Sequence, residues 1–174
     1  MQSVVARRKN IQNVGALRAY AKNWLGGKMK NYMEVKFKAI PENVAFARMC
    51  VAGFCLQLNP TIEEIDDIKT AVSEAVTNCV VHAYPKSVGD VSMRVEIENG
   101  EVQISVSDKG IGIKDFAKAR EPFYTTKLSE ERSGMGFSVM ESFMDNVELQ
   151  KNDEKGLKVV LTKHLSKSAQ SISC

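Results

Sequence analysis

Alternating and helical hydrophobic patterns divide most of the chain into short segments. Between residues 32 and 40 apolar side chains occupy every second position, which predicts a half-exposed strand. Over residues 41–58 apolar side chains return at helical spacing. Pro41 suits a first helical turn, and Asn59-Pro60 ends the segment. The first two elements predicted are therefore a strand and a helix.

A second helix is predicted from Thr61 to about Tyr84. Thr61 and Glu64 have the spacing of a capping box, in which each side chain binds the backbone N–H of the other residue. Apolar residues recur every three or four positions, as on the buried side of a helix. They are Ile65, Ile68, Val72, Ala75, Val76 and Cys79.

Two strands are predicted over 91–97 and 102–106, where apolar and polar residues alternate. Asn99-Gly100 between them is a strong hairpin signal, because both residues tolerate positive φ. A stretch rich in glycine, serine and charge follows over 109–136, with one short helix expected near 114–120. A loop of this length inside a compact domain is typical of an active-site lid.

A third helix is predicted over 136–143, and two last strands over 146–151 and 157–163. The resulting order is strand, helix, helix, hairpin, loop, helix, hairpin. Hairpin connections give antiparallel neighbours, so the sequence predicts an α+β fold with a mostly antiparallel sheet and helices packed on one face.

The composition fits a single soluble domain with a hydrophobic core. The 174 residues are 44% apolar and 26% charged, and no apolar run is long enough to span a membrane or resembles a secretion leader. The four cysteines show no CxxC spacing, which favours reduced thiols in a cytoplasmic protein over disulfides. Scattered cysteines and only two histidines also argue against a zinc site.

Residues 1–28 differ from the rest of the chain. They hold six basic residues and no acidic one, so the net charge of +3 for the whole chain leaves −3 on residues 29–174. That body has no basic stripe for nucleic acid. The segment 1–28 is either a basic amphipathic arm or an extension upstream of a natural start at Met29, where Gly26-Gly27 reflects a ribosome-binding sequence. We favour the start at Met29. Codons before Met29 that lack a GGAGG stretch would contradict this interpretation.

Three polar segments carry candidate chemistry, and the first lies on the second predicted helix. Glu74, Asn78 and His82 are four residues apart and form one polar stripe beside the apolar side. A solvated helix face would show the same spacing, so the stripe alone is weak support for a site.

The other two segments contain paired glycines. Asp108–Gly112 ends a predicted strand, so a carboxylate precedes backbone that a ligand can approach closely. Arg132–Gly136 precedes a predicted helix, whose free N–H groups and dipole favour an anion, and no Walker lysine follows it. Either segment alone would also suit an ordinary turn.

Together, in this order and placement, the segments resemble the ATP site of the Bergerat-type (GHKL) superfamily, which includes gyrases, heat-shock chaperones and histidine kinases. In detail they are most similar to the anti-sigma factor serine kinases, and among these to the sporulation branch. The matching segments are Ser73–Asn78 with His82, Asp108–Gly112, Phe123–Lys127, Glu131–Phe137 and Leu161–Ser168. The resemblance covers residues 29–168, implies a two-layer Bergerat fold, and leaves 169–174 as a frayed tail.

The resemblance implies roles for residues around the nucleotide. The side-chain oxygen of Asn78 would bind Mg²⁺, and Glu74 would take the proton from an attacking serine hydroxyl. Asp108 would accept a hydrogen bond from the adenine amino group. Gly110 and Gly112 would let the backbone pass close to the base.

The loop before the third helix would close as a lid over the phosphates. Gly134 and Gly136 would present backbone N–H groups to phosphate, and Thr126 and Lys127 would contribute further contacts. Arg132 would meet either phosphate or the protein substrate.

The resemblance also bears on one residue that could contact a protein partner and on one position near the adenine base. Arg48 matches a partner-contacting arginine of the family, and a solvated surface charge explains it about equally well. Family members usually have Gly-Thr in the last hairpin, with the threonine near adenine. Here Leu157 follows Gly156, so that contact is lost or mediated by water.

The function implied is that of a cytoplasmic, homodimeric anti-sigma factor that uses Mg·ATP. It would bind and inhibit a sporulation sigma factor. As an ATP-dependent protein-serine kinase it would also phosphorylate a serine of an anti-anti-sigma antagonist. The dimer would pair near the first strand and helix, and no direct contact with nucleic acid or membrane is expected.

Three alternatives stay open. A general-stress anti-sigma kinase would share the chemistry and differ in its sigma factor. A histidine-kinase-like catalytic domain would need a phosphoacceptor histidine in a dimerising helical hairpin, and neither His82 nor His164 lies in such a segment. A non-catalytic nucleotide sensor would have no need of a base at Glu74.

Overall fold

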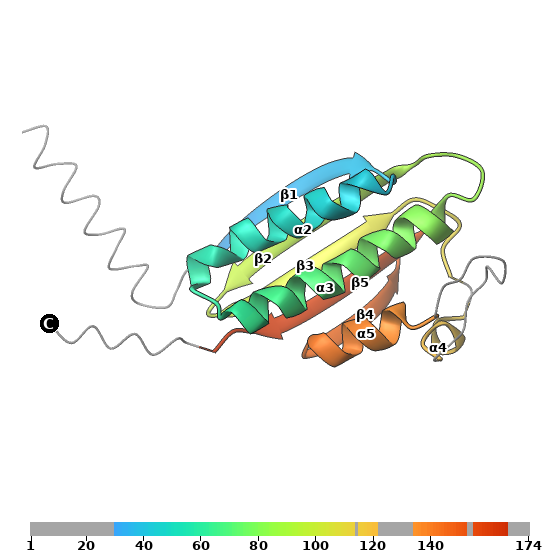
Figure 1. The fold of residues 1–174 in the computed structure, drawn as a ribbon. Helices are drawn as coiled ribbons and strands as arrows, with labels where there is room; N and C mark the ends of the chain where they lie inside the picture. The colour runs from blue at the N-terminus through green and yellow to red at the C-terminus, as the bar shows by residue number, and fades with distance from the viewer. Residues whose placement is uncertain (1–29, 114, 122–133, 153–154, 167–174) are drawn as a thin grey trace, which may run out of the picture.

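The structure is a computed structural model that describes residues 30–113, 115–121, 134–152 and 155–166 (Figure 1). Several predictions fall outside the described residues: the extension over 1–28 with its start at Met29, the lid residues Thr126, Lys127 and Arg132, and the tail over 169–174.

Five strands form one antiparallel sheet in the order β1-β2-β3-β5-β4. The strands are β1 (Lys30–Lys38), β2 (Asp90–Glu98), β3 (Glu101–Asp108), β4 (Asn146–Lys151) and β5 (Leu157–His164). Helices cover one face of this sheet (Figure 1), so the predicted α+β fold with an antiparallel sheet and helices on one side is confirmed.

Helices α2, α3 and α5 form the second layer, and α5 packs beside α3. The helices are α2 (Glu42–Cys55), α3 (Ile62–Asn78), α4 (Phe116–Ala119) and α5 (Gly136–Phe143). A 3₁₀ turn over 56–58 extends α2, and a π-helical turn over 79–83 extends α3. Among the described residues no helix combines the length and apolar character needed to cross a bilayer.

The main differences from the predicted element boundaries are at β1 and at the end of the second helix. β1 lies two residues earlier than expected, because Lys30–Lys38 pair with β2 and the N–H of Ile40 then bonds back to the Lys38 carbonyl. The second helix is α-helical only to Asn78, and the following turn is π-helical. Hydrophobic spacing alone does not reveal a π-helical turn, since its residues stay in one continuous run.

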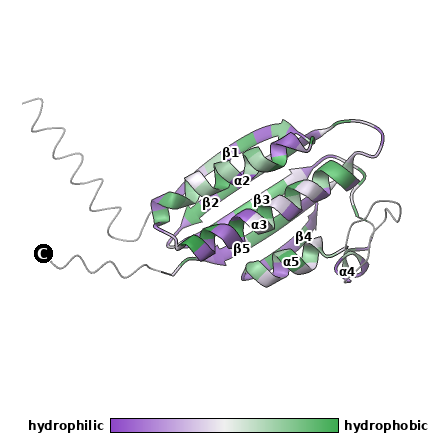
Figure 2. Cartoon of the chain, in the orientation of Figure 1, coloured by the Kyte–Doolittle hydropathy of each residue, from purple (hydrophilic) through white to green (hydrophobic). Residues whose placement is uncertain are grey.

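The core lies between the sheet and helices α2, α3 and α5. Alternate residues of β2 and β3 point to it and are fully buried, namely Val91, Met93, Val95, Ile97, Val102, Ile104 and Val106. The helical side is contributed mainly by α3, through Ile68, Ala71, Val72, Ala75 and Val76. Figure 2 shows hydrophobic positions on the strands beneath the helices and hydrophilic ones along the outer side of α3. Burial stabilises each valine or isoleucine by about 1.5–3 kcal/mol.

Local sequence signals explain the turn between β2 and β3 and the start of α3. Asn99 and Gly100 adopt φ values of 53° and 85°, which is the conformation that a tight β2–β3 hairpin requires. The side chain of Thr61 accepts a hydrogen bond from the N–H of Glu64 at 3.1 Å, and the Glu64 carboxylate accepts from the N–H of Thr61 at 2.8 Å. The predicted hairpin and capping box are therefore both confirmed.

Candidate functional site

The C-terminal end of α3 carries two polar side chains beside its buried face. Glu74 and Asn78 are one turn apart and half-buried, next to Ala75 and Cys79, which face the core. In the described part of the chain, the Glu74 carboxylate and the Asn78 amide have no hydrogen-bond or ion-pair partner. Their hydrogen-bonding capacity is therefore available to a ligand.

The first residue of α5 faces this pair. A Cβ placed on Gly136 would lie 3.1 Å from Oε2 of Glu74 and 3.5 Å from both amide atoms of Asn78. Glycine is thus the residue that leaves room between the helix end and the two side chains. No side chain caps α5 at Met135, and a helix N-terminus with free N–H groups attracts anions.

Asp108 forms the second half of the site at the end of β3. It continues the buried alternation of Val102, Ile104 and Val106 and is only 3% exposed. Its Oδ1 accepts hydrogen bonds from the N–H groups of Gly110 at 2.8 Å and Leu157 at 3.4 Å. Burial raises the pKa of the Asp108 carboxyl above its ordinary value, although these hydrogen bonds act in the opposite direction.

Glycines allow three backbone segments to meet around Asp108. A Cβ on Gly110 would lie 2.1 Å from the Ala83 carbonyl oxygen, which accepts a hydrogen bond from the N–H of Ile111 at 2.9 Å. A Cβ on Gly156 would lie 2.2 Å from the Asp108 carbonyl oxygen, and Gly156 has φ +101°. Both positions therefore require glycine for close backbone approach.

Tyr84 joins the segment that follows α3 to the segment that follows β3. Its hydroxyl accepts from the N–H of Lys109 at 2.9 Å and donates to the Asp90 carbonyl at 2.7 Å. Its ring fills the space that a Cβ on Gly89 would enter. The segment after α3 is thus held against the segment after β3.

This donor set fits a nucleotide with a metal-bound phosphate chain. An amide oxygen and a carboxylate beside a helix N-terminus suit a cation and an anion held together. A buried carboxylate at the end of β3 suits a hydrogen-bond donor on a heterocyclic base. The two ends of such a ligand would be matched by the two halves of the site.

The sequence comparisons identify the family of proteins that this chain resembles. Residues 37–163 match the family model of the histidine kinase-like ATPase domain. The anti-sigma F factor of Clostridium acetobutylicum is 52% identical over 135 residues, which cover 78% of this chain and 94% of that protein. That of Bacillus subtilis is 49% identical over 141 residues, which cover 80% of this chain and 97% of that protein.

This chain belongs to the anti-sigma F factor family. The resemblance drawn from its sequence motifs is therefore confirmed.

Solved structures agree on the fold. The RsbU and RsbW domains of Rv1364c from Mycobacterium tuberculosis give a TM-score of 0.56 at 20% identity, over 78% of this chain and 32% of that one. The catalytic domain of the histidine kinase ThkA gives a TM-score of 0.51 at 16% identity, over 76% of this chain and 96% of that one. At these identities the likeness concerns the fold alone.

The structure brings most of the predicted site residues together. Glu74, Asn78 and Gly136 form one group, and Asp108, Gly110 and Gly112 form another, with Gly112 next to Gly156. Gly134 lies two residues before α5 with φ +64°.

The structure also places two further residues that the sequence analysis singled out. His82, the last residue of the predicted polar stripe, lies in the π-helical turn. Arg48 is exposed on α2.

Three contributors to the site were not predicted from sequence. They are Cys79, whose thiol reaches Asp108; Tyr84; and Gly156, whose close approach to the Asp108 backbone the family pattern did not imply. The contacts of Cys79 with Asp108 and of Tyr84 with Lys109 join residues that are 29 and 25 positions apart in the chain. The only local signal was that Cys79 directly follows Asn78 on the buried side of the helix.

Proposed function

We propose that this chain is an anti-sigma factor that binds a sporulation sigma factor and, with Mg·ATP, phosphorylates a serine of its antagonist protein. The single observation that carries the proposal is that Glu74 and Asn78, which have no polar partner among the described residues, lie beside the glycine-led N-terminus of α5. About 50% identity to anti-sigma F factors over nearly their full length supports the partner class.

The base of the nucleotide would bind at Asp108. Oδ1 is held by two backbone N–H groups, and Oδ2, which the Cys79 thiol also contacts, would accept a hydrogen bond from the 6-amino group of adenine. Gly110 and Gly112 would keep the neighbouring backbone free of side chains where the base lies. This arrangement favours a base that donates at position 6.

The phosphates would bind between α3 and α5. The side-chain oxygen of Asn78 would be a ligand of Mg²⁺, and the N–H groups that follow Gly134 and Gly136 would bind phosphate oxygens. Bound Mg²⁺ would neutralise charge on the phosphates and orient them for transfer. We propose that Thr126 and Lys127 complete this contact and that Arg132 binds either phosphate or the protein substrate.

Glu74 would act as the general base. The serine hydroxyl oxygen of the antagonist forms a bond to the γ-phosphorus while the bond to the ADP oxygen breaks. The proton of the hydroxyl passes to the Glu74 carboxylate. The free carboxylate beside Gly136 is suited to this role because its oxygens accept no other hydrogen bond among the described residues.

The partner surface is proposed to include Arg48 on α2. Phe46 and Met49 on the same helix are 46% and 70% exposed, so the arginine stands among apolar side chains that a protein partner could cover. A cytoplasmic homodimer that pairs near β1 and α2 is also proposed, and the position of β1 at the edge of the sheet is compatible with it.

The test is incubation of the full chain with γ-labelled ATP, Mg²⁺, a candidate antagonist and a candidate sigma factor. We expect acid-stable phosphoserine on the antagonist and capture of the sigma factor by the chain. Acid-labile phosphate on His82 or His164 would instead indicate a histidine-kinase-like reaction. Labelled antagonist without sigma-factor binding would remove the anti-sigma role alone.

A further inference from the structure

The thiol of Cys79 contacts the carboxylate of Asp108. Sγ lies 3.7 Å from Oδ2, within hydrogen-bond distance for sulfur, and both residues are 3% exposed. The contact joins the first residue after α3 to the last residue of β3, and Asn78 directly precedes the cysteine. It therefore lies between the two halves of the proposed nucleotide site.

The two oxygens of Asp108 are held in different ways. Oδ1 accepts from the backbone N–H groups of Gly110 and Leu157. Oδ2 accepts from Cys79, which is the only side chain among the described residues that donates to this carboxylate. Leu157 contributes its backbone N–H, while its side chain is buried and has no polar atom.

We propose that Cys79 is a positioning residue for base recognition, whose thiol holds Oδ2 of Asp108 in the orientation that accepts the 6-amino group of adenine. The proposal rests on the proposed function, in which this carboxylate binds the base. A carboxylate oxygen has two lone pairs, so Oδ2 can accept from the thiol and from the base together.

The thiol keeps its proton in this role. Burial and the neighbouring Asp108 charge raise the pKa of the Cys79 thiol well above its ordinary value. An ordinary cysteine thiol is protonated at neutral pH, so the S–H group can donate to Oδ2 across the 3.7 Å separation, and a buried protonated thiol is a poor nucleophile. This separates the proposed role from that of a redox or covalent site.

The experiment compares ATP with inosine triphosphate, which carries an oxygen in place of the 6-amino group. Wild-type chain and the variants Cys79→Ala and Cys79→Ser are titrated with each nucleotide by calorimetry in the presence of Mg²⁺. We expect Cys79→Ala to weaken ATP binding about three- to tenfold and inosine triphosphate binding less than about twofold. Cys79→Ser, which keeps a donor, should retain the wild-type ratio of the two affinities.

Cys55→Ala is the matched control, because Cys55 is also a fully buried thiol and lies in α2 away from Asp108. It should leave both affinities unchanged. An equal loss for both nucleotides in Cys79→Ala, no loss for either, or a lowered ratio in Cys79→Ser would overturn the positioning role. A wild-type chain that binds neither nucleotide would overturn the proposed function itself, and the inference with it.

Discussion

The two ends of helix α3 carry similar polar side chains in opposite circumstances. At the N-terminal end, Glu64 and Asp67 are hydrogen-bonded to other parts of the chain. At the C-terminal end, Glu74 and Asn78 have no such partner among the described residues. The helix spans about 25 Å between its ends, at roughly 1.5 Å per residue. One helix thus provides a fixed end that stabilises the fold and an open end that is available to a ligand.

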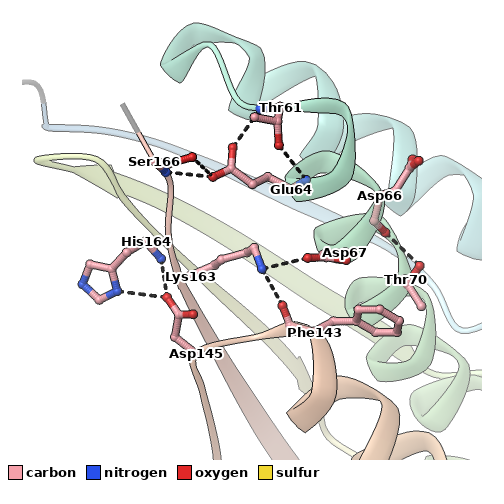
Figure 3. Close-up of polar contacts among 10 residues, drawn as sticks. All are labelled: Thr61, Glu64, Asp66, Asp67, Thr70, Phe143, Asp145, Lys163, His164 and Ser166. Atoms are coloured by element: carbon pink, nitrogen blue, oxygen red, sulfur yellow. Dashed lines mark hydrogen bonds and ion pairs between the residues drawn. The ribbon is translucent and has the colours of Figure 1, made fainter. Parts of the chain in front are cut away.

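The fixed end joins α3 to the last strand (Figure 3). The carboxylate of Glu64 accepts from the N–H and the hydroxyl of Ser166 at 2.8 and 2.7 Å, in addition to its bond with Thr61. Burial opposes ionisation of Glu64, but these hydrogen bonds outweigh it and lower the pKa. Lys163 lies between Asp67 at 2.9 Å and the Phe143 carbonyl at 2.7 Å.

This difference shows that residue type and helical spacing do not assign a role to a polar side chain. Glu64 and Glu74 lie on the same helix, yet the first has its acceptor capacity filled by backbone and side-chain donors. The second faces a glycine that leaves space in front of it. A carboxylate whose acceptors are already used stabilises structure, and one left open can take a proton or a ligand.

The largest expected effect is loss of phosphoryl transfer in Glu74→Gln. Removing a general base lowers the rate by about 10²–10⁴-fold, while the amide keeps the size of the side chain and ATP binding within about twofold. The measurement is single-turnover transfer from labelled ATP, with ATP affinity determined in parallel.

Glu64→Gln is the control at the fixed end. It should lower thermal stability by about 0.5–1.5 kcal/mol and leave transfer by the folded protein unchanged. Equal transfer rates for Glu74→Gln and wild type would remove the base from the mechanism.

The next largest effect is expected for Gly156→Ala. The added Cβ would lie 2.2 Å from the Asp108 carbonyl oxygen in a residue with φ +101°, so the backbone has to move. We expect a loss of about 2–3 kcal/mol in the free energy of unfolding and weaker ATP binding. Urea denaturation and calorimetry measure the two quantities.

Gly53→Ala provides the comparison for this glycine. Gly53 lies in α2 with nothing within 4 Å of its would-be Cβ, so the substitution should stabilise the protein by about 0.5–1 kcal/mol. If both alanine variants changed stability by the same amount and sign, the close approach at Asp108 would have no energetic importance.

A smaller effect, on stability alone, is expected for Lys163→Met. The variant leaves the half-buried Asp67 carboxylate and the Phe143 carbonyl without their donor, which costs about 1–2 kcal/mol. ATP affinity should stay within about twofold, because the open end of α3 is untouched.

Lys69→Met removes the more exposed ion pair with Asp66 and should cost no more than about 0.5 kcal/mol. Equilibrium unfolding in urea checks both variants. A tenfold loss of ATP affinity in Lys163→Met would show that the two ends of α3 are not independent.

The smallest expected effect is on the stability of the folded protein at low pH, and it arises from the carboxyl of Asp145. Its carboxylate accepts from the backbone N–H of His164 at 2.7 Å, and this hydrogen bond lowers the pKa of Asp145 in the folded state. The stabilisation that ionised Asp145 provides is therefore fully present above the pKa of about 3.9 that its carboxyl has in the unfolded chain. It is lost as the pH falls through the lower pKa of Asp145 in the folded protein. Because Asp145 is about half exposed, we expect less than about 1 kcal/mol.

Asp145→Asn removes this titration, so its stability should fall less steeply than that of wild type between about pH 5 and 2. Thermal denaturation across that range measures the slope. Parallel curves for the two proteins would contradict the assignment of this contribution to Asp145.

The regular elements were predictable because each has a strong local signal. The capping box at Thr61, the hairpin at Asn99-Gly100 and the alternation in β2 and β3 each follow from neighbouring residues. Helix α5 was predicted with its observed bounds, since Gly136 and Phe143 delimit one apolar repeat. The mostly antiparallel character of the sheet followed from the hairpin order, whereas the order of the strands in the sheet was not predicted.

Contacts between distant segments were predictable only in part. The family resemblance implied that α3, the end of β3 and the start of α5 meet, but it did not imply the thiol contact to Asp108 or the Tyr84 bridge. Lys163 was likewise unremarked, because an alternating strand pattern does not show which helix its side chain will reach. Such contacts depend on side-chain direction in three dimensions, which one sequence does not encode locally.

The central claim is that residues from α3, β3 and α5 bind one nucleotide together with Mg²⁺. Calorimetric titration of the full chain with ATP and Mg²⁺ tests it most directly, alongside Asp108→Asn and Asn78→Ala. The account predicts saturable heat for wild type, weaker ATP binding in Asp108→Asn, and loss of the Mg²⁺ dependence in Asn78→Ala. No heat with wild type, or identical isotherms for all three proteins, would contradict it.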